Sequence, residues 1–230
     1  MIFHRINFLD IRKIEYFCEE YLDINPYFMP EHLFILSSMY LVEVGFDQNS
    51  CGLRICKEKG KWNEYPLFKK ELFYQKYEDL CYTYSVDCFT DHRKYKKYHK
   101  MKKSLLKKNE YELRVLKKED FPSIVLFMQE YYKSIGKLNE EPYFLMLSKL
   151  KFIFEHLYEL KMDAVGIYLE DELKGIYVGF HNKGYYIIES MLVLEEFEPV
   201  ILDYAIMIAG KNKEKIVFFE KIEDILKCLR

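Results

Sequence analysis

The stretch that decides the fold runs from Ala164 to Leu194 and reads AVGIYLEDELKGIYVGFHNKGYYIIESMLVL. Apolar residues alternate with others along residues 165–170, and β-prone runs lie on both sides of His181–Gly184. A turn rich in Asn and Gly between such runs is typical of a hairpin, because these residues tolerate positive φ angles. The stretch therefore predicts three consecutive antiparallel strands joined by tight turns.

Working outward, apolar spacing and breaker residues predict a mixture of helices and strands on both sides of these three strands. The predicted helices cover residues 10–22, 31–38, 68–79, 92–108, 119–136, 142–160, 199–210 and 222–229, and the predicted strands cover residues 39–46, 52–57, 80–86, 110–116 and 215–220. Asp10 is the expected cap of the first helix, and Gly210 is expected to end the seventh. An apolar stripe is expected on helix 142–160, formed by Phe144, Leu147, Phe154 and Leu157.

Residues 1–88 and 110–230 each begin with helices and continue into antiparallel strands, a helix and a strand. We therefore expect an α+β protein made of two similar halves, in which mixed, largely antiparallel sheets are flanked by helices. Residues 89–109 form the expected connection between them.

The composition narrows the class of protein. Only 9 of the 230 residues are Gly, so glycine-dependent phosphate loops are not expected. Six cysteines occur without CxxC spacing, which predicts no metal clamp and favours a reducing compartment such as the cytoplasm. No apolar run approaches the roughly 20 residues of a membrane-spanning helix.

The charges are segregated along the chain. Nine Lys or Arg and no acid lie within His92–Lys108, whereas nine Asp or Glu and two Lys lie within Asp163–Asp203. An apolar stripe along the first of these segments predicts a basic helix; its members are Tyr95, Tyr98, Met101 and Leu105. This helix is either a solvated face with lysines extended over tyrosines, or a binding face for nucleic acid, acyl-carrier phosphates or lipid headgroups.

Two candidate catalytic residues lie on the third predicted strand. Glu189 and Tyr186 are three residues apart, so their side chains point to opposite faces and only one can line a cleft. Glu189 lies among apolar residues, where a desolvated carboxylate can serve as a general base for an incoming amine. The alternative is an exposed glutamate without a catalytic role.

A second candidate group is expected near the junction of the halves, where ligand clefts often occur. Tyr82 and Tyr84 share one face of a predicted strand and precede the basic helix. An aromatic and cationic wall for a substrate or anion is formed, in this hypothesis, by Tyr82, Tyr84, Arg93, Lys97, Lys100 and Lys103.

Residues 110–220 give the order strand, helix, helix, three antiparallel strands, helix, strand, which resembles the order of the GNAT acyltransferase superfamily. Two phrases are also similar to that superfamily: Leu116-Lys-Lys-Glu-Asp120 before a helix, and Leu169-Glu-Asp-Glu-Leu-Lys-Gly175 before a strand. More narrowly, most of the chain resembles the catalytic region of bacterial phosphatidylglycerol lysyltransferases and related single-domain proteins of unknown role, which pair two GNAT-like halves. Their basic Lys-Arg-Asn segment corresponds to Lys102–Ser104, with Ser104 in place of Asn.

The resemblance bears on the donor. In members that use coenzyme A, the third strand is followed by a glycine-containing loop that holds the pyrophosphate. The corresponding loop here, Glu195–Pro199, has three carboxylates and no Gly. Acetyl-CoA or another acyl-CoA stays open as a donor without the usual loop, and the resemblance adds aminoacyl-tRNA, which the lipid lysyltransferases use.

The resemblance therefore implies two GNAT-like halves and transfer of an acyl or aminoacyl group to an amine or hydroxyl. The alternative is a non-catalytic GNAT-like module that uses the basic helix to bind an anionic partner such as a nucleic acid.

Overall fold

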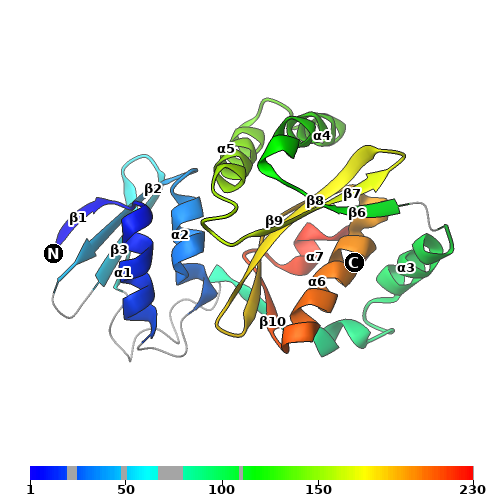
Figure 1. Ribbon diagram of the computed structural model, residues 1–230, viewed down its shortest axis with the longest axis horizontal. Coiled ribbons are helices and arrows are strands. Elements are labelled where there is room, and N and C mark those ends of the chain that lie inside the picture. Colours follow the sequence, from blue (N-terminus) through cyan, green and yellow to red (C-terminus); the bar gives the residue numbers. More distant parts are fainter. Residues whose placement is uncertain (20–24, 48–50, 67–79, 109–110, 230) are drawn as a thin grey trace. The chain divides into compact units, whose positions relative to one another are not determined.

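The computed structural model describes residues 1–19, 25–47, 51–66, 80–108 and 111–229, so the helix expected over residues 68–79 lies outside the described residues. The chain divides into two compact units, Met1–Leu80 and Cys81–Arg230 (Figure 1). The expected boundaries were residues 88 and 110, whereas residues 81–109 are part of the second unit.

The first unit consists of helices and one antiparallel sheet with the strand order β1-β2-β3-β4. Its elements are β1 (Ile2–Arg5), α1 (Phe8–Glu19), η1 (Pro26–Phe28), α2 (Pro30–Leu36), β2 (Leu41–Phe46), β3 (Cys51–Glu58) and β4 (Lys61–Pro66). Fully buried apolar side chains from the helices and strands, among them Ile14, Leu33 and Val44, form its core.

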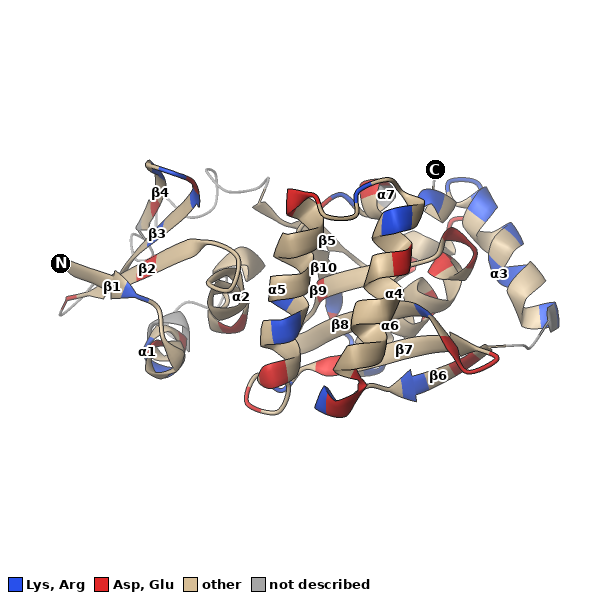
Figure 2. Cartoon of the chain, turned by 90° about the horizontal axis from the view of Figure 1, so that it is seen from above, with Lys and Arg blue, Asp and Glu red and all other residues tan. Residues whose placement is uncertain are grey.

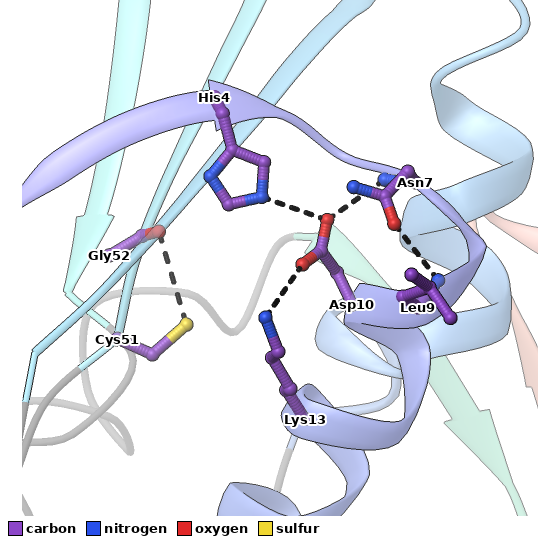
Figure 3. A network of polar contacts seen from close by, with 7 residues as sticks. All are labelled: His4, Asn7, Leu9, Asp10, Lys13, Cys51 and Gly52. Atoms are coloured by element: carbon purple, nitrogen blue, oxygen red, sulfur yellow. Dashed lines mark hydrogen bonds and ion pairs between the residues drawn. The ribbon is translucent and has the colours of Figure 1, made fainter.

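Helix α1 begins earlier than expected, because Asn7 rather than Asp10 caps it (Figure 3). The side chain of Asn7 accepts a hydrogen bond from the backbone N–H of Leu9 at 2.9 Å, and Asp10 Oδ2 accepts one from the backbone N–H of Asn7 at 3.0 Å. Asp10 is buried and also contacts His4 Nε2 at 3.0 Å. These two bonds satisfy the N–H groups of Asn7 and Leu9, which a helix start leaves without intrahelical partners.

The second unit contains a six-stranded sheet with the order β5-β10-β9-β8-β7-β6. Only β9 and β10 are parallel, so the fold is α+β with mixed, largely antiparallel sheets, as predicted. Its strands are β5 (Tyr82–Tyr84), β6 (Tyr111–Val115), β7 (Asp163–Leu169), β8 (Glu172–Asn182), β9 (Tyr185–Val193) and β10 (Lys215–Phe218). Its helices are η3 (Val86–Thr90), α3 (Lys96–Lys108), η4 (Lys118–Asp120), α4 (Phe121–Ser134), α5 (Glu141–Glu155), η5 (Glu195–Phe197), α6 (Glu198–Asn212), α7 (Ile222–Ile225) and η6 (Lys227–Leu229).

The three strands predicted from the opening stretch are β7, β8 and β9. Each of the two turns between them has two central residues at positive φ: Glu170 (50°) and Asp171 (63°), then Lys183 (46°) and Gly184 (82°). Two-residue turns of this kind match the right-handed twist of the strands that they join. The antiparallel strand prediction is therefore confirmed.

The helices cover the two faces of this sheet separately. Helices α4 and α5 lie on one face, and α6 and α7 lie on the other (Figures 1 and 2). Helix α6 continues past Gly210 to Asn212 and ends at Lys213 in the left-handed region, so the expected end at Gly210 was wrong.

The apolar face of α5 also differs from the predicted stripe. Phe154 is buried as predicted, and Leu147 and Leu157 are half-buried, but Phe144 is exposed. The other buried residues include Tyr143, Leu150 and Ile153. The charged residue Lys149 lies among them, buried within the same face.

Candidate functional site

The strands β9 and β10 separate at one end of the sheet. Their pairing runs from Tyr185 opposite Lys215 to Ile188 opposite Phe218, where β10 ends, while β9 continues to Val193. At the same level β9 contains a β-bulge, since Ser190 lies opposite Val178 and Ile188 lies opposite Gly179. Glu189 therefore has no residue opposite it on β8, and bulges of this kind re-aim side chains next to functional sites.

A pocket of about 430 Å³ opens beside this bulge. It is lined by α4, α5, the last residues of β9, and the segment that follows β10. Seven of its lining residues are ionisable: Tyr131, Tyr132, Lys137, Lys149, Glu189, Glu220 and Asp224. A concave site in which apolar walls carry a few convergent polar groups is the usual form of a small-molecule site.

Glu189 is buried in the pocket wall and paired with a lysine. It is 3% exposed, and its Oε1 lies 2.7 Å from Nζ of Lys149, which is 9% exposed. The same Nζ donates a hydrogen bond to the backbone carbonyl of Glu189. The lysine thus connects α5 to the bulge of β9 and gives the buried carboxylate a counter-ion next to the pocket.

Two tyrosines of α4 supply hydroxyl groups to the same pocket. Burial raises the pKa of Tyr132 to about 12, with smaller contributions from Tyr131 and Glu220. Burial also raises the pKa of Tyr131, with the charge of Glu198 adding to it. Both phenols are therefore protonated at neutral pH and can donate hydrogen bonds to a ligand.

Tyr186 lies on the other face of the sheet, as the spacing of three residues predicts. It is fully buried among residues that pack on α6, and its hydroxyl donates a hydrogen bond to Asp163 Oδ2 at 3.3 Å. His181 also contacts Asp163, through Nε2 at 3.5 Å. Burial raises the pKa of Tyr186 well above its usual value. Tyr186 is not part of the pocket wall, so the structure does not bring the two catalytic candidates together.

On the face of α6, residues 222–229 fill the space that follows the separation of β9 and β10. The buried side chains of Ile222, Leu226 and Cys228 pack in one cluster with Val193 of β9 and Phe197 of η5. The backbone N–H of Cys228 donates a hydrogen bond to Glu198 Oε2 at 2.6 Å. Glu198 is 3% exposed and is the first residue of α6. The backbone of residues 222–229 therefore contacts Glu198 at the start of α6.

Polar contacts of the basic helix α3 hold η5 and η6 together beside the start of α6. Lys97 Nζ donates to Glu195 Oε1 at 2.8 Å and to the carbonyl oxygen of Lys227 at 3.1 Å. Lys227 Nζ lies 3.7 Å from Glu195 Oε2. The hydrogen bond from Lys97 lowers the pKa of Glu195 and keeps it ionised.

The predicted apolar stripe of the basic helix is confirmed. Tyr95 and Tyr98 are buried, and Met101 and Leu105 pack partly buried against the same cluster. On the polar side, Lys102 Nζ lies 2.8 Å from Asp203 Oδ2. Of the four cations predicted to bind a substrate or anion, Lys97 is the one described above in an ion pair. The other three are exposed and form no ion pair among the described residues: Arg93, Lys100 and Lys103.

The two tyrosines of the second candidate group lie on the edge strand β5. The ring of Tyr84 packs against Phe218 at 5.8 Å, and its hydroxyl accepts a hydrogen bond from the backbone N–H of Ile222 at 3.4 Å. Nζ of Lys221 lies 6.0 Å from the ring centroid of Tyr82. Tyr84 is thus a partly buried packing residue, and neither tyrosine lines the pocket beside Glu189.

Sequence reasoning missed Lys149, although a signal was present. Lys149 is three residues after Met146 and four residues before Ile153, so it lies on the face of α5 that packs on the sheet. A lysine at such a position needs a partner, and Glu189 was already a candidate.

Among the described residues, no cluster of three or more His, Cys, Asp or Glu side chains could hold a metal ion. None of the helices that the structure describes is long and apolar enough to cross a membrane.

Comparison with solved structures gives the class of fold. The chain matches a conserved protein of unknown function from Bacteroides thetaiotaomicron with a TM-score of 0.70 and 10% identity, over 95% of this chain and 90% of that chain. It also matches the C-terminal domain of a protein described as a lysylphosphatidylglycerol synthetase from Agrobacterium fabrum, with a TM-score of 0.51 and 9% identity, over 91% of this chain and 78% of that chain. No protein-family model and no curated protein sequence matches the chain.

The chain therefore has a GNAT-like fold similar to that synthetase domain, as the resemblance implied. A shorter match to an N-acetyltransferase from Thermoplasma acidophilum in complex with coenzyme A has a TM-score of 0.37 and 18% identity, over 45% of this chain and 74% of that chain.

The start of α6 does not fit the pyrophosphate of coenzyme A. Pro199 has no backbone N–H to donate, and Glu198 is buried at the place where a phosphate needs donors and no like charge. Cys228 already donates its backbone N–H to Glu198. The N–H of Cys228 is thus already bonded to the carboxylate of Glu198 at the place where a bound anion would need free N–H donors.

Proposed function

We propose that this protein transfers an acyl or aminoacyl group to an amine or hydroxyl acceptor, and that the pocket beside Glu189 is the place of reaction. The observation that supports this most directly is the buried carboxylate of Glu189, held by Lys149 in a pocket wall where two parallel strands separate. A GNAT-like fold alone does not establish an activity, so the proposal depends on this site.

In the proposed reaction, Glu189 is the general base. The nitrogen or oxygen of the acceptor attacks the acyl carbon, its proton passes to Glu189, and the bond to the leaving group breaks as the tetrahedral intermediate collapses. Tyr132 lines the same pocket with a pKa of about 12, so it is protonated at neutral pH and can give the leaving group a proton. Glu189 then returns its proton to the tyrosinate, either directly or through solvent.

The donor is the second part of the proposal. Because the start of α6 does not fit a pyrophosphate, we expect an aminoacyl-tRNA rather than coenzyme A to supply the group. The exposed cations of α3 suit a polyanionic donor of this kind.

The test is a transfer assay with labelled aminoacyl-tRNAs and labelled acyl-CoAs against a panel of amine and hydroxyl acceptors. Glu189→Gln should lower kcat about 10²- to 10⁴-fold, as is typical of a lost general base. Glu159→Gln, an exposed glutamate outside the pocket, is the matched control and should keep the wild-type rate. Wild-type protein that transfers no group from any donor, or Glu189→Gln protein with unchanged kcat, would contradict the proposal.

A second candidate function is a non-catalytic module that binds an anionic partner through α3. Exposure of Lys100 and Lys103 on α3, and of Arg93 in the turn before it, favours it. Replacement of all three by Glu should abolish tRNA binding, whereas replacement of three exposed lysines elsewhere, Lys133, Lys151 and Lys161, should have little effect. Binding should weaken with salt, because phosphate contacts release counterions. Tight binding without transfer would favour the module over the enzyme.

A further inference from the structure

Lys149 is a cation buried in the pocket wall, and its contacts with the described residues leave at least one of its N–H donors without an acceptor. An ammonium group carries three N–H donors. Nζ contacts Oε1 of Glu189 at 2.7 Å and donates to the carbonyl oxygen of the same residue. Among the residues that the structure describes, Lys149 has no other protein acceptor, although its side chain lines the pocket.

A purely structural role explains this arrangement poorly. A buried ion pair is rarely more stable than two well-packed apolar side chains, because desolvation of both charges offsets their attraction. At this position on α5 the neighbouring residues that face the sheet are apolar, including Leu150 and Ile153. The pair therefore costs stability that packing alone would not require, and charged groups held at such cost in pockets are typical of functional sites.

We propose that the remaining N–H of Lys149 binds a negatively charged oxygen of the ligand in this pocket, either a carboxylate present in the bound molecule or the acyl oxygen that becomes anionic during transfer. The acyl-oxygen alternative rests on the proposed transferase function. Binding of a ligand carboxylate by Lys149 does not depend on that function. Glu189 Oε1 and the carbonyl of Glu189 fix the ammonium in place, so no reorganisation is needed when the charge appears.

In the transfer reaction, Lys149 stabilises the acyl oxygen while that oxygen carries a negative charge. The lone pair of the acceptor forms a bond to the acyl carbon, and the carbonyl π electrons move onto oxygen, which Lys149 stabilises by a hydrogen bond. The electrons return as the leaving group departs. Lys149 stays protonated throughout, while Glu189 takes and returns the proton of the acceptor.

The first experiment uses acetate as the anionic probe and acetamide as a neutral probe of similar shape. Both are titrated into the full chain at constant ionic strength and followed by NMR. Lys149→Gln alone leaves Glu189 without its counter-ion, so the variants compared are Glu189→Gln, which keeps the ammonium, and Glu189→Gln with Lys149→Gln, which replaces the ion pair by two amides. If the ligand brings its own carboxylate, wild type and Glu189→Gln bind acetate in preference to acetamide, and the double variant loses this preference.

The second experiment measures kcat and KM with an active donor for wild type, Lys149→Gln and Lys149→Arg. Because Lys149→Gln also removes the counter-ion of Glu189, kcat is compared on the pH-independent plateau of each protein, where a changed charge on Glu189 does not enter. If the acyl oxygen is the anion, Lys149→Gln lowers kcat about 10²- to 10³-fold with KM little changed, as loss of one oxyanion donor does in other enzymes, and Lys149→Arg recovers part of it. The inference is overturned if acetate shows no preference over acetamide in wild type and kcat of Lys149→Gln is unchanged, or if wild type prefers acetate and the double variant keeps the same preference. If no donor reacts, the proposed function fails, and the acetate experiment alone decides the role of Lys149.

Discussion

The two faces of the second unit's sheet differ at the point where β10 ends and β9 continues. On the α6 face, residues 222–229 pack into the space beyond Phe218, and Glu198 binds the backbone of Cys228. We call this the filled face. On the face covered by α4 and α5 (Figure 2), the same strands border a pocket. Its volume is about 430 Å³ and it is lined by Glu189 and Lys149, and we call this the pocket face.

The difference between the two faces indicates where a ligand can bind next to the sheet. A separation of parallel strands creates space on both faces of a sheet, and here apolar side chains and one carboxylate occupy one side. The polar groups on the other side are buried at a cost in stability, which apolar packing does not explain. On the filled face, stability should therefore depend mainly on apolar packing. On the pocket face, the largest loss of stability should come from removing one partner of the ion pair and leaving the other charge buried.

The largest effect is expected from Lys149→Met on the pocket face. The change leaves the carboxylate of Glu189 buried without its counter-ion, and breaking a buried pair in this way typically costs about 3–5 kcal/mol. Urea unfolding measures the loss. Lys151→Met, two residues further on the exposed side of α5, should stay within about 0.5 kcal/mol of wild type.

Adding Glu189→Leu to Lys149→Met should recover much of the lost stability, because no unpaired charge remains. A Lys149→Met protein as stable as wild type would show that the pair does not form, and it would remove the contrast between the two faces.

The next effect is expected from Leu226→Ala on the filled face. Leu226 is fully buried in the cluster that residues 222–229 form with α6, so its truncation should cost about 2–5 kcal/mol. Its neighbour Ile225 lines the pocket and is only partly buried, so Ile225→Ala should cost less than half as much. Equal losses in urea unfolding would mean that residues 222–229 are packed equally on both faces.

The sequence predicts much of this fold because the signals are local. Alternation and turn chemistry locate β7, β8 and β9, since Lys183 and Gly184 adopt the positive φ that a two-residue turn requires. Spacings of three and four residues likewise locate the buried side of α3 through Tyr95 and Tyr98.

The candidate site is only half predictable, because its other half depends on contacts between distant segments. Glu189 stands out as a carboxylate in an apolar strand, but Lys149 lies 40 residues away, on a helix whose face was assigned from Phe144. The side chains on both faces of β9 are buried, so its sequence has no apolar–polar alternation that the bulge at Glu189 could interrupt. The contact of Glu198 with Cys228 is likewise invisible until α6 and residues 222–229 are placed together.

A smaller effect is expected from Glu198→Ala, which tests the polar contact of the filled face. The change leaves the buried N–H of Cys228 without an acceptor, and an unsatisfied buried donor costs about 1–3 kcal/mol. Glu198→Gln retains an oxygen acceptor and should lose less. If both variants unfold at the urea concentration of wild type, the carboxylate does not hold residues 222–229 against α6.

The smallest effect is expected where α3 packs on the filled face, from Tyr98→Phe. The hydroxyl of Tyr98 donates to Asp203 Oδ1, and burial together with that carboxylate raises the pKa of Tyr98, so the donor stays neutral. Loss of the bond should cost about 1 kcal/mol, because Lys102 remains 2.8 Å from Asp203 and keeps it paired.

Tyr95→Phe is the matched control on the same helix. Tyr95 is equally buried, but its hydroxyl has no hydrogen-bond partner among the described residues, so its removal should leave stability unchanged or raise it slightly. Both rings keep their packing in the phenylalanine variants, and only the polar contact differs between them. A larger loss for Tyr98→Phe than for Tyr95→Phe in urea unfolding would therefore assign the energy to the bond with Asp203. Equal losses would instead show that α3 is held on the filled face by its apolar stripe and ion pairs alone.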